Sequence, residues 1–193
     1  MMTFSSSSDD VRIATIVAAA RRGDRGAVEW LFTELQPPLL RYLRAQDSRA
    51  AEDLAGEVWM AVATRLGEFE GDWMDFRGWV FSIARRRLAD HRRTMVRRRT
   101  DVAAAEMFER CPASEETDRL ALDALSAQEA ATLIVSVLNA DQAEVLLLRL
   151  LADLDVDQVA TIMGRSANWV RVTQHRGLRT LAARVGPKIV VMG

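Results

Sequence analysis

The chain has 193 residues, of which 49% are hydrophobic and 27% charged, and its formal net charge is -1. This is the composition of an ordinary folded protein, with room for one large domain or two small ones. Apolar runs such as residues 145–151 are too short to span a bilayer. We therefore expect no membrane insertion, and the single Cys111 fits a reducing, cytoplasmic location.

The first half of the chain is predicted to be helical, because its apolar residues recur with helical rather than strand spacing. Residues 1–10 are polar, without a signal-peptide pattern, and are expected to be a disordered tail. We expect one helix to end before Pro37-Pro38 and Ser48 to cap a later one. The expected helices cover residues 11–20, 26–35, 38–45, 48–66 and 76 onward.

Arginines concentrate between Arg85 and Arg99, where eight of them stand against Asp90 alone. We expect an inward face made of Phe76, Val80, Ile83, Ala84 and Leu88. A second face carries Arg86, Asp90, Arg93 and Arg97, with Arg85 and Arg92 beside it. Neutralising phosphates is the strongest sequence-independent contribution to DNA binding, and it is the simplest use of this block. From about Thr94 the helical pattern weakens, which predicts a mobile arm.

An acidic segment follows directly, since residues 101–128 hold seven acids and two arginines. Its polar core, "CPASEET", predicts a linker over residues 100–118. Helical patterns resume near Asp118 and continue to about Val185. The predicted fold class is therefore all-α, with small helical domains at residues 11–99 and 119–186 and a tail at 187–193.

The segment after Val156 has the pattern of a helix-turn-helix. This motif needs a small residue at the helix crossing, a turn residue such as glycine, and an apolar residue that seats the second helix. Ala160, Gly164 and Val170 occupy the fifth, ninth and fifteenth positions from Val156. The inward residues of the second helix would be Val170, Thr173, Gly177 and Leu181. Its outward stripe would be Asn168, Arg171, Val172, His175, Arg176 and Arg179.

This outward stripe suits the major groove of DNA. Arginine can bond guanine edges and phosphates, asparagine can bond adenine, and an aliphatic side chain can contact a thymine methyl. The alternative is a solvated arginine face on an ordinary helix hairpin.

Three segments together resemble the extracytoplasmic-function (ECF) group of the sigma-70 family. They are "AAEDLAGEVWMAV", "FEGDWMDFRGWVFSIARRRLADHRR" and "LNADQAEVLLLRLLADLDVDQVATIMGRSANWVRVTQHRGLRTL". Their order and spacing make the match specific over nearly the whole chain. The "RRRLADHRR" and "VRVTQHRGL" versions look like those of actinobacterial members.

The resemblance implies a sigma factor without cofactor or enzymatic activity. It would bind core RNA polymerase through the beta-prime clamp and beta flap, direct it to promoter DNA and promote melting, and an anti-sigma factor is a further implied partner. Residues 11–99 would be sigma region 2 and residues 119–186 sigma region 4. The implied minus-thirty-five contacts are Arg165, Ser166, Asn168, Arg171, Val172, His175, Arg176 and Arg179. The implied minus-ten contacts are Trp73, Phe76, Arg85, Arg86, Asp90, Arg92, Arg93 and Arg97. The implied contacts to core polymerase are Glu52, Asp53 and Glu57.

Two positions depart from the family pattern. Gly56 stands where the family often has glutamine, and Arg86 stands where it often has asparagine near minus-ten bases.

Among the aromatics, we expect Trp73 to be exposed and Trp79 to lie in the core, while Phe76 is open to either a core role or a flipped-base role. The acidic linker resembles one that threads the polymerase cleft, and a solvated tether is the equal alternative. Its acids are Glu106, Glu109, Glu115, Glu116 and Asp118.

Two other classes of protein compete with this interpretation. A one-component helix-turn-helix regulator would use the C-terminal motif alone, and would leave "EDLAGEVW", the aromatic loop and the arginine block unexplained. A nucleic-acid enzyme is disfavoured because the chain has two histidines, one cysteine and no clustered metal-ligand spacing.

Overall fold

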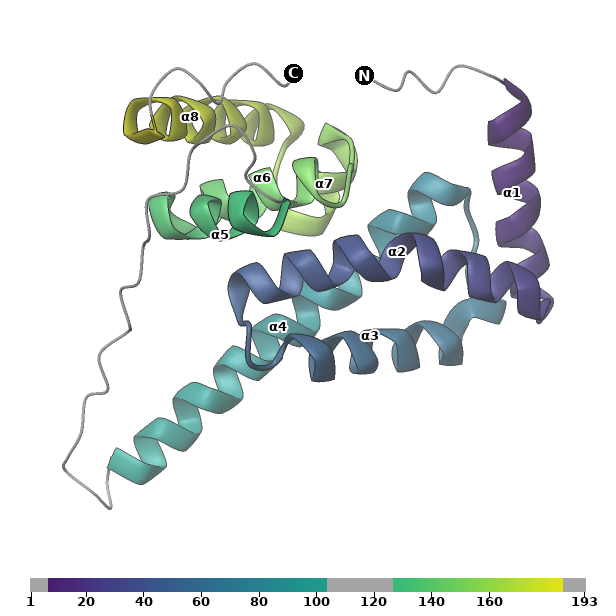
Figure 1. Cartoon of the computed structure of the whole chain (residues 1–193), viewed down its shortest axis with the longest axis horizontal. Helices are drawn as coiled ribbons and strands as arrows, with labels where there is room; N and C mark the ends of the chain where they lie inside the picture. The colour runs from purple at the N-terminus through teal and green to yellow at the C-terminus, as the bar shows by residue number, and fades with distance from the viewer. Residues whose placement is uncertain (1–6, 104–126, 186–193) are drawn as a thin grey trace.

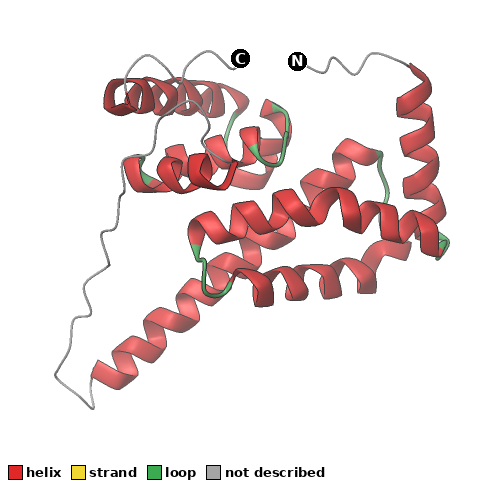
Figure 2. Ribbon diagram, in the orientation of Figure 1, coloured by secondary structure: helices red, strands yellow, loops and turns green. Residues whose placement is uncertain are grey.

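The computed structural model describes residues 7–103 and 127–185, and the regular structure in these ranges is helical (Figure 2). This confirms the predicted all-α class. No helix in these ranges is long and apolar enough to cross a membrane. Most of the predicted linker, with Cys111, and the tail from residue 187 lie outside the described residues. The helices are α1 (Ser7–Arg21), α2 (Arg25–Gln46), α3 (Ala51–Arg65), the short 3-10 helix η1 (Leu66–Glu68), α4 (Trp73–Ala103), α5 (Ala127–Val137), α6 (Ala140–Leu150), α7 (Val156–Met163) and α8 (Ala167–Val185).

Helices α1 to α4 form a first unit around one apolar core. Tyr42 of α2 and Phe81 of α4 are both fully buried and meet edge to face, with ring centroids 5.5 Å apart. On α3 the side chains of Leu54, Val58 and Val62 are buried on one face, with Ala61 half-buried. The inward stripe expected on α4 is buried throughout. The 3.6-residue period of the apolar residues therefore located this core correctly.

The prediction that a helix ends before Pro37 is wrong, because α2 continues through Pro37 and Pro38. Each proline lacks an N–H for the helical ladder and costs about 3 kcal/mol in a helix interior. The apolar period continues across them, and the side chains of Leu31, Leu35 and Leu39 are all buried. Burying a leucine contributes about 1.5–3 kcal/mol, so the three buried leucines together are comparable to the two proline penalties and offset them.

Three helix ends also differ from expectation. Helix α1 begins at Ser7, inside the predicted tail. Helix α3 begins at Ala51 rather than after Ser48, because the carboxylate of Asp47 accepts the N–H groups of Arg49 and Ala50, both at 3.2 Å. Helix α4 continues past Thr94 to Ala103, so the predicted mobile arm is helical and the linker begins later than residue 100.

Helices α5 to α8 form a second unit, which lies across α2 and the start of α4 (Figure 1). Its core includes Leu146 and Val170, which are fully buried. Gly177 allows α8 to approach α6 closely, because a Cβ there would lie 3.2 Å from Cδ1 of Leu146. The inward residues predicted for α8 are confirmed: Val170, Thr173 and Gly177 are buried, and Leu181 is half-buried.

Candidate nucleic-acid interface

Helices α7 and α8 form the predicted helix-turn-helix. Asp155 and Gln158 make a reciprocal capping box that starts α7, with Asp155 Oδ1 accepting the Gln158 N–H at 2.8 Å. Gly164 ends α7 in the left-handed region, at φ 63° and ψ 39°, and the Arg165 N–H donates to the Ala160 carbonyl at 2.9 Å. Glycine adopts this conformation without steric cost. The turn thus sets the angle at which α8 leaves α7.

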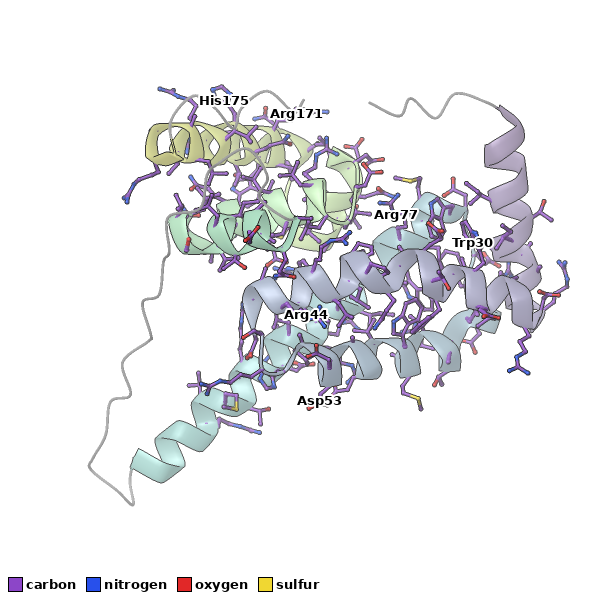
Figure 3. All side chains as sticks on the ribbon, in the orientation of Figure 1. Trp30, Arg44, Asp53, Arg77, Arg171 and His175 are labelled. Carbon is purple, nitrogen blue, oxygen red and sulfur yellow. The ribbon has the colours of Figure 1, made fainter. Side chains whose placement is uncertain are left out.

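The outer face of α8 carries the predicted stripe. Arg171 and His175 point away from the rest of the molecule (Figure 3), and Val172 is 40% exposed. At the start of the helix, the Arg165 guanidinium lies 5.2 Å from the centre of the Trp169 ring, and the Ser166 hydroxyl accepts the Trp169 N–H. Every member of the stripe is exposed: Asn168, Arg171, Val172, His175, Arg176 and Arg179.

Four arginines of the block, Arg86, Arg92, Arg93 and Arg97, are exposed on α4, whereas Arg85 and Arg87 are half-buried. Arg92 donates to the Gln46 side chain at 2.9 Å, and Arg93 pairs with Asp90 one turn earlier. Nearby, Nε2 of His91 lies 3.3 Å from Oδ2 of Asp47, which ties α4 to the end of α2. The exposed members of the predicted minus-ten set are Arg86, Asp90, Arg92, Arg93 and Arg97.

The aromatic side chains in the first turns of α4, which begins at Trp73 rather than near Phe76, are more buried than predicted. Phe76 has no exposed surface and packs against Phe69 and Trp79, with centroids 5.4 and 5.8 Å away. Phe76 is therefore a core residue and is not positioned to receive an unpaired base. Trp73, expected to be exposed, is half-buried because its ring packs 5.1 Å from that of Trp30. Trp79 is half-buried and stacks on Phe69.

Helix α3 presents the three predicted core-binding acids on its solvent side. Glu52 accepts from Arg44 at 2.6 Å, and this hydrogen bond lowers the pKa of the Glu52 carboxyl. Glu57 lies 3.9 Å from Arg87 of α4. Asp53 is exposed at the outer edge of α3 (Figure 3). Of the three, Asp53 is the carboxylate most available to a partner.

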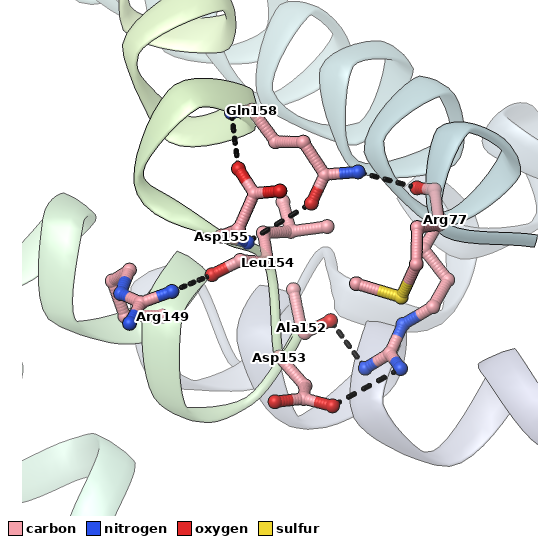
Figure 4. A network of polar contacts seen from close by, with 8 residues as sticks. Arg77, Arg149, Ala152, Asp153, Leu154, Asp155 and Gln158 are labelled. Atoms are coloured by element: carbon pink, nitrogen blue, oxygen red, sulfur yellow. Dashed lines mark hydrogen bonds and ion pairs between the residues drawn. The ribbon is translucent and has the colours of Figure 1, made fainter. Parts of the chain in front are cut away.

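A network of polar contacts joins the two units, and sequence reasoning missed it (Figure 4). Arg77 of α4 donates to the carbonyl of Ala152 and pairs with Asp153 at 3.2 Å. Gln158 of α7 donates to the carbonyl of Met74 at 2.8 Å. Each contact joins positions more than 70 residues apart and ends on a backbone carbonyl or a loop carboxylate, so no local pattern could have revealed it.

A second group of contacts joins α2 and α4 to the second unit. Tyr42 donates to Glu144 at 2.5 Å, and Gln46 donates to the same carboxylate at 3.3 Å. Burial, and then the Glu144 charge, raises the pKa of the Tyr42 hydroxyl well above its ordinary value. Arg85 donates to the carbonyl of Ile162 at 3.2 Å and lies 3.7 Å from Glu144. Arg85, predicted to contact DNA, is thus held by the second unit.

These features define a class: an all-helical protein of two units with a helix-turn-helix and two exposed arginine surfaces. The family model described as Sigma-70 region 2 matches residues 31–99, and the model described as Sigma-70, region 4 matches residues 128–181. Both matches lie inside the ranges that the sequence analysis gave to its two domains.

Curated relatives agree with the family models. The chain is 34% identical over 183 residues to the ECF RNA polymerase sigma factor ShbA of Streptomyces griseus, covering 89% of this chain and 94% of ShbA. It is 33% identical over 178 residues to the ECF RNA polymerase sigma factor BldN of Streptomyces coelicolor, covering 91% of this chain and 66% of BldN. The chain belongs to the ECF sigma factors of the sigma-70 family, which are DNA-binding factors of transcription initiation.

A solved structure shares the fold. The sigma factor RpoE, in complex with the anti-sigma factor NepR from Bartonella quintana, superposes with a TM-score of 0.64 at 19% identity. The alignment covers 83% of this chain and 98% of that one. This likeness confirms the fold expected from the three sequence segments.

Proposed function

We propose that the second unit reads the minus-thirty-five element by placing α8 in the major groove. The observation that carries this proposal is the exposed stripe on the second helix of a helix-turn-helix. Arg171 and Arg176 supply bidentate donors for guanine, Asn168 supplies an amide for adenine, and Val172 supplies an aliphatic contact. Arg165 and Ser166 stand at the helix N-terminus, where backbone N–H groups favour a phosphate.

The first unit would engage the minus-ten region through the arginine flank of α4. Arg86, Arg92, Arg93 and Arg97 are exposed and can neutralise phosphates. Asp90 then serves to orient Arg93. Trp73 is the candidate for stacking on an unpaired base, a contact that contributes about 1–3 kcal/mol per base.

Core RNA polymerase would dock on the acidic side of α3, which opposes a basic partner surface such as the beta-prime clamp. Asp53 would make the first contact with the polymerase. Glu52 and Glu57 would bind it after releasing Arg44 and Arg87, their contacts within this chain. At Gly56 a glutamine side chain is missing from this surface, and a Cβ there would meet nothing within 4 Å. The beta flap is the expected partner of the second unit.

The remaining assignments follow from family membership. We infer a cytoplasmic protein that needs no cofactor and catalyses no reaction, with region 2 over residues 11–99 and region 4 over residues 119–186. The acidic segment between them would tether the two DNA-reading units. An anti-sigma factor is a candidate partner, since RpoE is seen with one.

Run-off transcription with purified core polymerase on genomic fragments, followed by start-site mapping, tests this function. Arg171→Ala should reduce promoter-specific transcript while leaving co-purification with core polymerase unchanged. Arg184→Ala is the matched control, because this arginine is also exposed on α8 but lies off the stripe. Unchanged transcript from Arg171→Ala would remove this residue from the contact set. Specific binding of a duplex without polymerase at physiological salt would favour a one-component regulator.

A further inference from the structure

An apolar groove lies between α2 and α3, which run side by side in the first unit (Figure 1). Its volume is about 290 Å3, and the residues that line it all have apolar side chains or are glycine. Leu31 and Phe76 are buried and belong to its floor. Around it stand Val28, Phe32 and Met60, whose exposed fractions are 39, 44 and 69%. Large apolar side chains gathered in water around one hollow indicate an interaction site.

Gly56 keeps this groove open, although the fold does not require a glycine there. The residue is helical, and a Cβ added to it would meet no atom within 4 Å. Glycine in a helix is less stable than alanine, so this residue weakens α3 without relieving any contact. Because Gly56 itself lines the groove, a longer side chain at this position, such as glutamine, would occupy the opening. The missing side chain therefore matters to a partner rather than to the fold.

The groove adjoins the acidic surface that we assign to core RNA polymerase. On α3, Asp53, Gly56, Glu57 and Met60 follow one another at i, i+3, i+4 and i+7, so they lie on one side of the helix. All four residues are exposed, and Asp53 marks this side of α3 in Figure 3. A partner that docks on the two carboxylates would therefore also cover the groove.

The charge around the groove selects among its possible occupants. A second copy of this chain would bring the same surface of both copies together, so Asp53 and Glu57 would face like charges and repel. Small-molecule pockets typically measure about 300–1,000 Å3 and contain polar groups that orient the ligand. This groove is smaller, and its one side-chain N–H, on Trp59, already donates to Gln36 at 2.5 Å. A basic protein surface that carries a large apolar side chain fits both the carboxylates and the hollow.

We propose that the groove receives one large aliphatic or aromatic side chain of core RNA polymerase, and that Gly56 is the residue that admits it. Phe32 of α2 and Met60 of α3 would contact this anchor from the two helices. An apolar anchor in a pocket, ringed by groups that exclude water, is the arrangement that concentrates binding free energy in protein interfaces. This inference rests on the proposed docking of core polymerase on α3.

Equilibrium binding of the full-length protein to purified core RNA polymerase tests the groove. Gly56→Gln should weaken binding about tenfold or more, because burying one large apolar side chain contributes at least that much affinity. Gly56→Ala, which adds only a Cβ, should weaken binding less than Gly56→Gln. Thr33→Gln is the control, because it adds the same side chain to an exposed position of α2 outside the groove. Equal or tighter binding by Gly56→Gln than by the parent would overturn the proposal.

A second variant alters the groove from the side of α2. Phe32→Ser removes one apolar wall and should also weaken binding to core polymerase. Met95→Ser is its control, because Met95 is a similarly exposed apolar residue of α4, at 39%, and lies outside the groove. Urea unfolding of both variants shows whether the first unit stays folded. Equal binding by the two folded variants would contradict the proposal.

Salt dependence distinguishes the apolar anchor from the carboxylates beside it. Salt screens exposed charges but not an apolar contact. The loss caused by Gly56→Gln should therefore be the same at low and high salt, whereas the loss caused by Asp53→Asn should shrink as salt rises. If salt reduces both losses alike, the Gly56 contact is electrostatic and the apolar anchor is wrong.

The outcomes separate this inference from the proposed function. If Asp53→Arg with Glu57→Arg binds core polymerase as the parent does, polymerase docks elsewhere and the function proposed for α3 fails. If that double variant is weakened and Gly56→Gln is not, only the groove proposal fails. A parent that sediments as a dimer, with Gly56→Gln as a monomer, would assign the groove to a second copy and would also overturn the proposal.

Discussion

Gly164→Ala should destabilise the second unit by an amount that the turn geometry determines. Nothing lies within 4 Å of the added Cβ, so the penalty is conformational rather than a clash. A left-handed L-residue costs about 1–2 kcal/mol, and the stiffer unfolded chain returns about 0.4–1 kcal/mol. The net loss is about 1 kcal/mol. Gly56→Ala is the matched control, because its Cβ also meets nothing but the glycine is helical, where alanine gains about 1 kcal/mol.

The two variants have separate reporters. Trp169 is the one tryptophan of the second unit, whereas Trp59 packs against the core of the first. Urea unfolding monitored by 19F NMR of fluorotryptophan-labelled protein gives a separate unfolding midpoint for Trp169 and for Trp59. With a denaturant slope of about 1 kcal/mol/M for such a small unit, Gly164→Ala should lower the Trp169 midpoint by about 1 M, and Gly56→Ala should raise the Trp59 midpoint. An unchanged or raised Trp169 midpoint in Gly164→Ala would refute the assigned turn.

Three further predictions concern the first unit. Asp53→Arg with Glu57→Arg should weaken co-purification with core polymerase, and an unaffected yield would show that the clamp binds elsewhere. Phe76→Ala should lower the free energy of unfolding by about 3–5 kcal/mol; a loss of promoter melting at unchanged stability would instead restore its flipped-base role. Arg44→Ala should return the pKa of Glu52 upward toward its ordinary value in an NMR titration. Because that pKa is depressed in the folded state, the stability difference between variant and parent should be present near neutral pH and disappear as pH falls through the folded pKa.

Local periodicity was sufficient to predict the class, the helix-turn-helix and both buried stripes. The helix-turn-helix requires a small residue at Ala160, a turn residue at Gly164 and an apolar residue at Val170. Each requirement is local, so the residue types and their spacing are visible in the sequence. The exposed stripe of α8 followed from the same period. These parts of the site were predictable because a helix places its own residues without reference to the rest of the fold.

The errors arose where tertiary packing overrides a local preference. Pro37 and Pro38 indicated a helix end, yet the buried leucine face of α2 continues through them. Phe76 was left open, because its sequence signature is the same whether it faces a base or the core, and the structure buries it completely. Arg85 looked like its neighbours, but it sits at the angle on α4 that faces α7. The contact partners in each case lie in other elements, which a single helical period does not encode.

Fewer arginines of α4 are available to neutralise DNA phosphates than their number in the sequence suggests. Arg85 is held by the second unit, Arg87 lies near Glu57, and Arg93 is paired with Asp90. Counterion release scales with the phosphates actually neutralised, not with the arginines present. Docking Glu57 on polymerase would release Arg87 of α4 from this carboxylate. Polymerase binding and promoter binding would therefore reinforce each other through charges already built into α4.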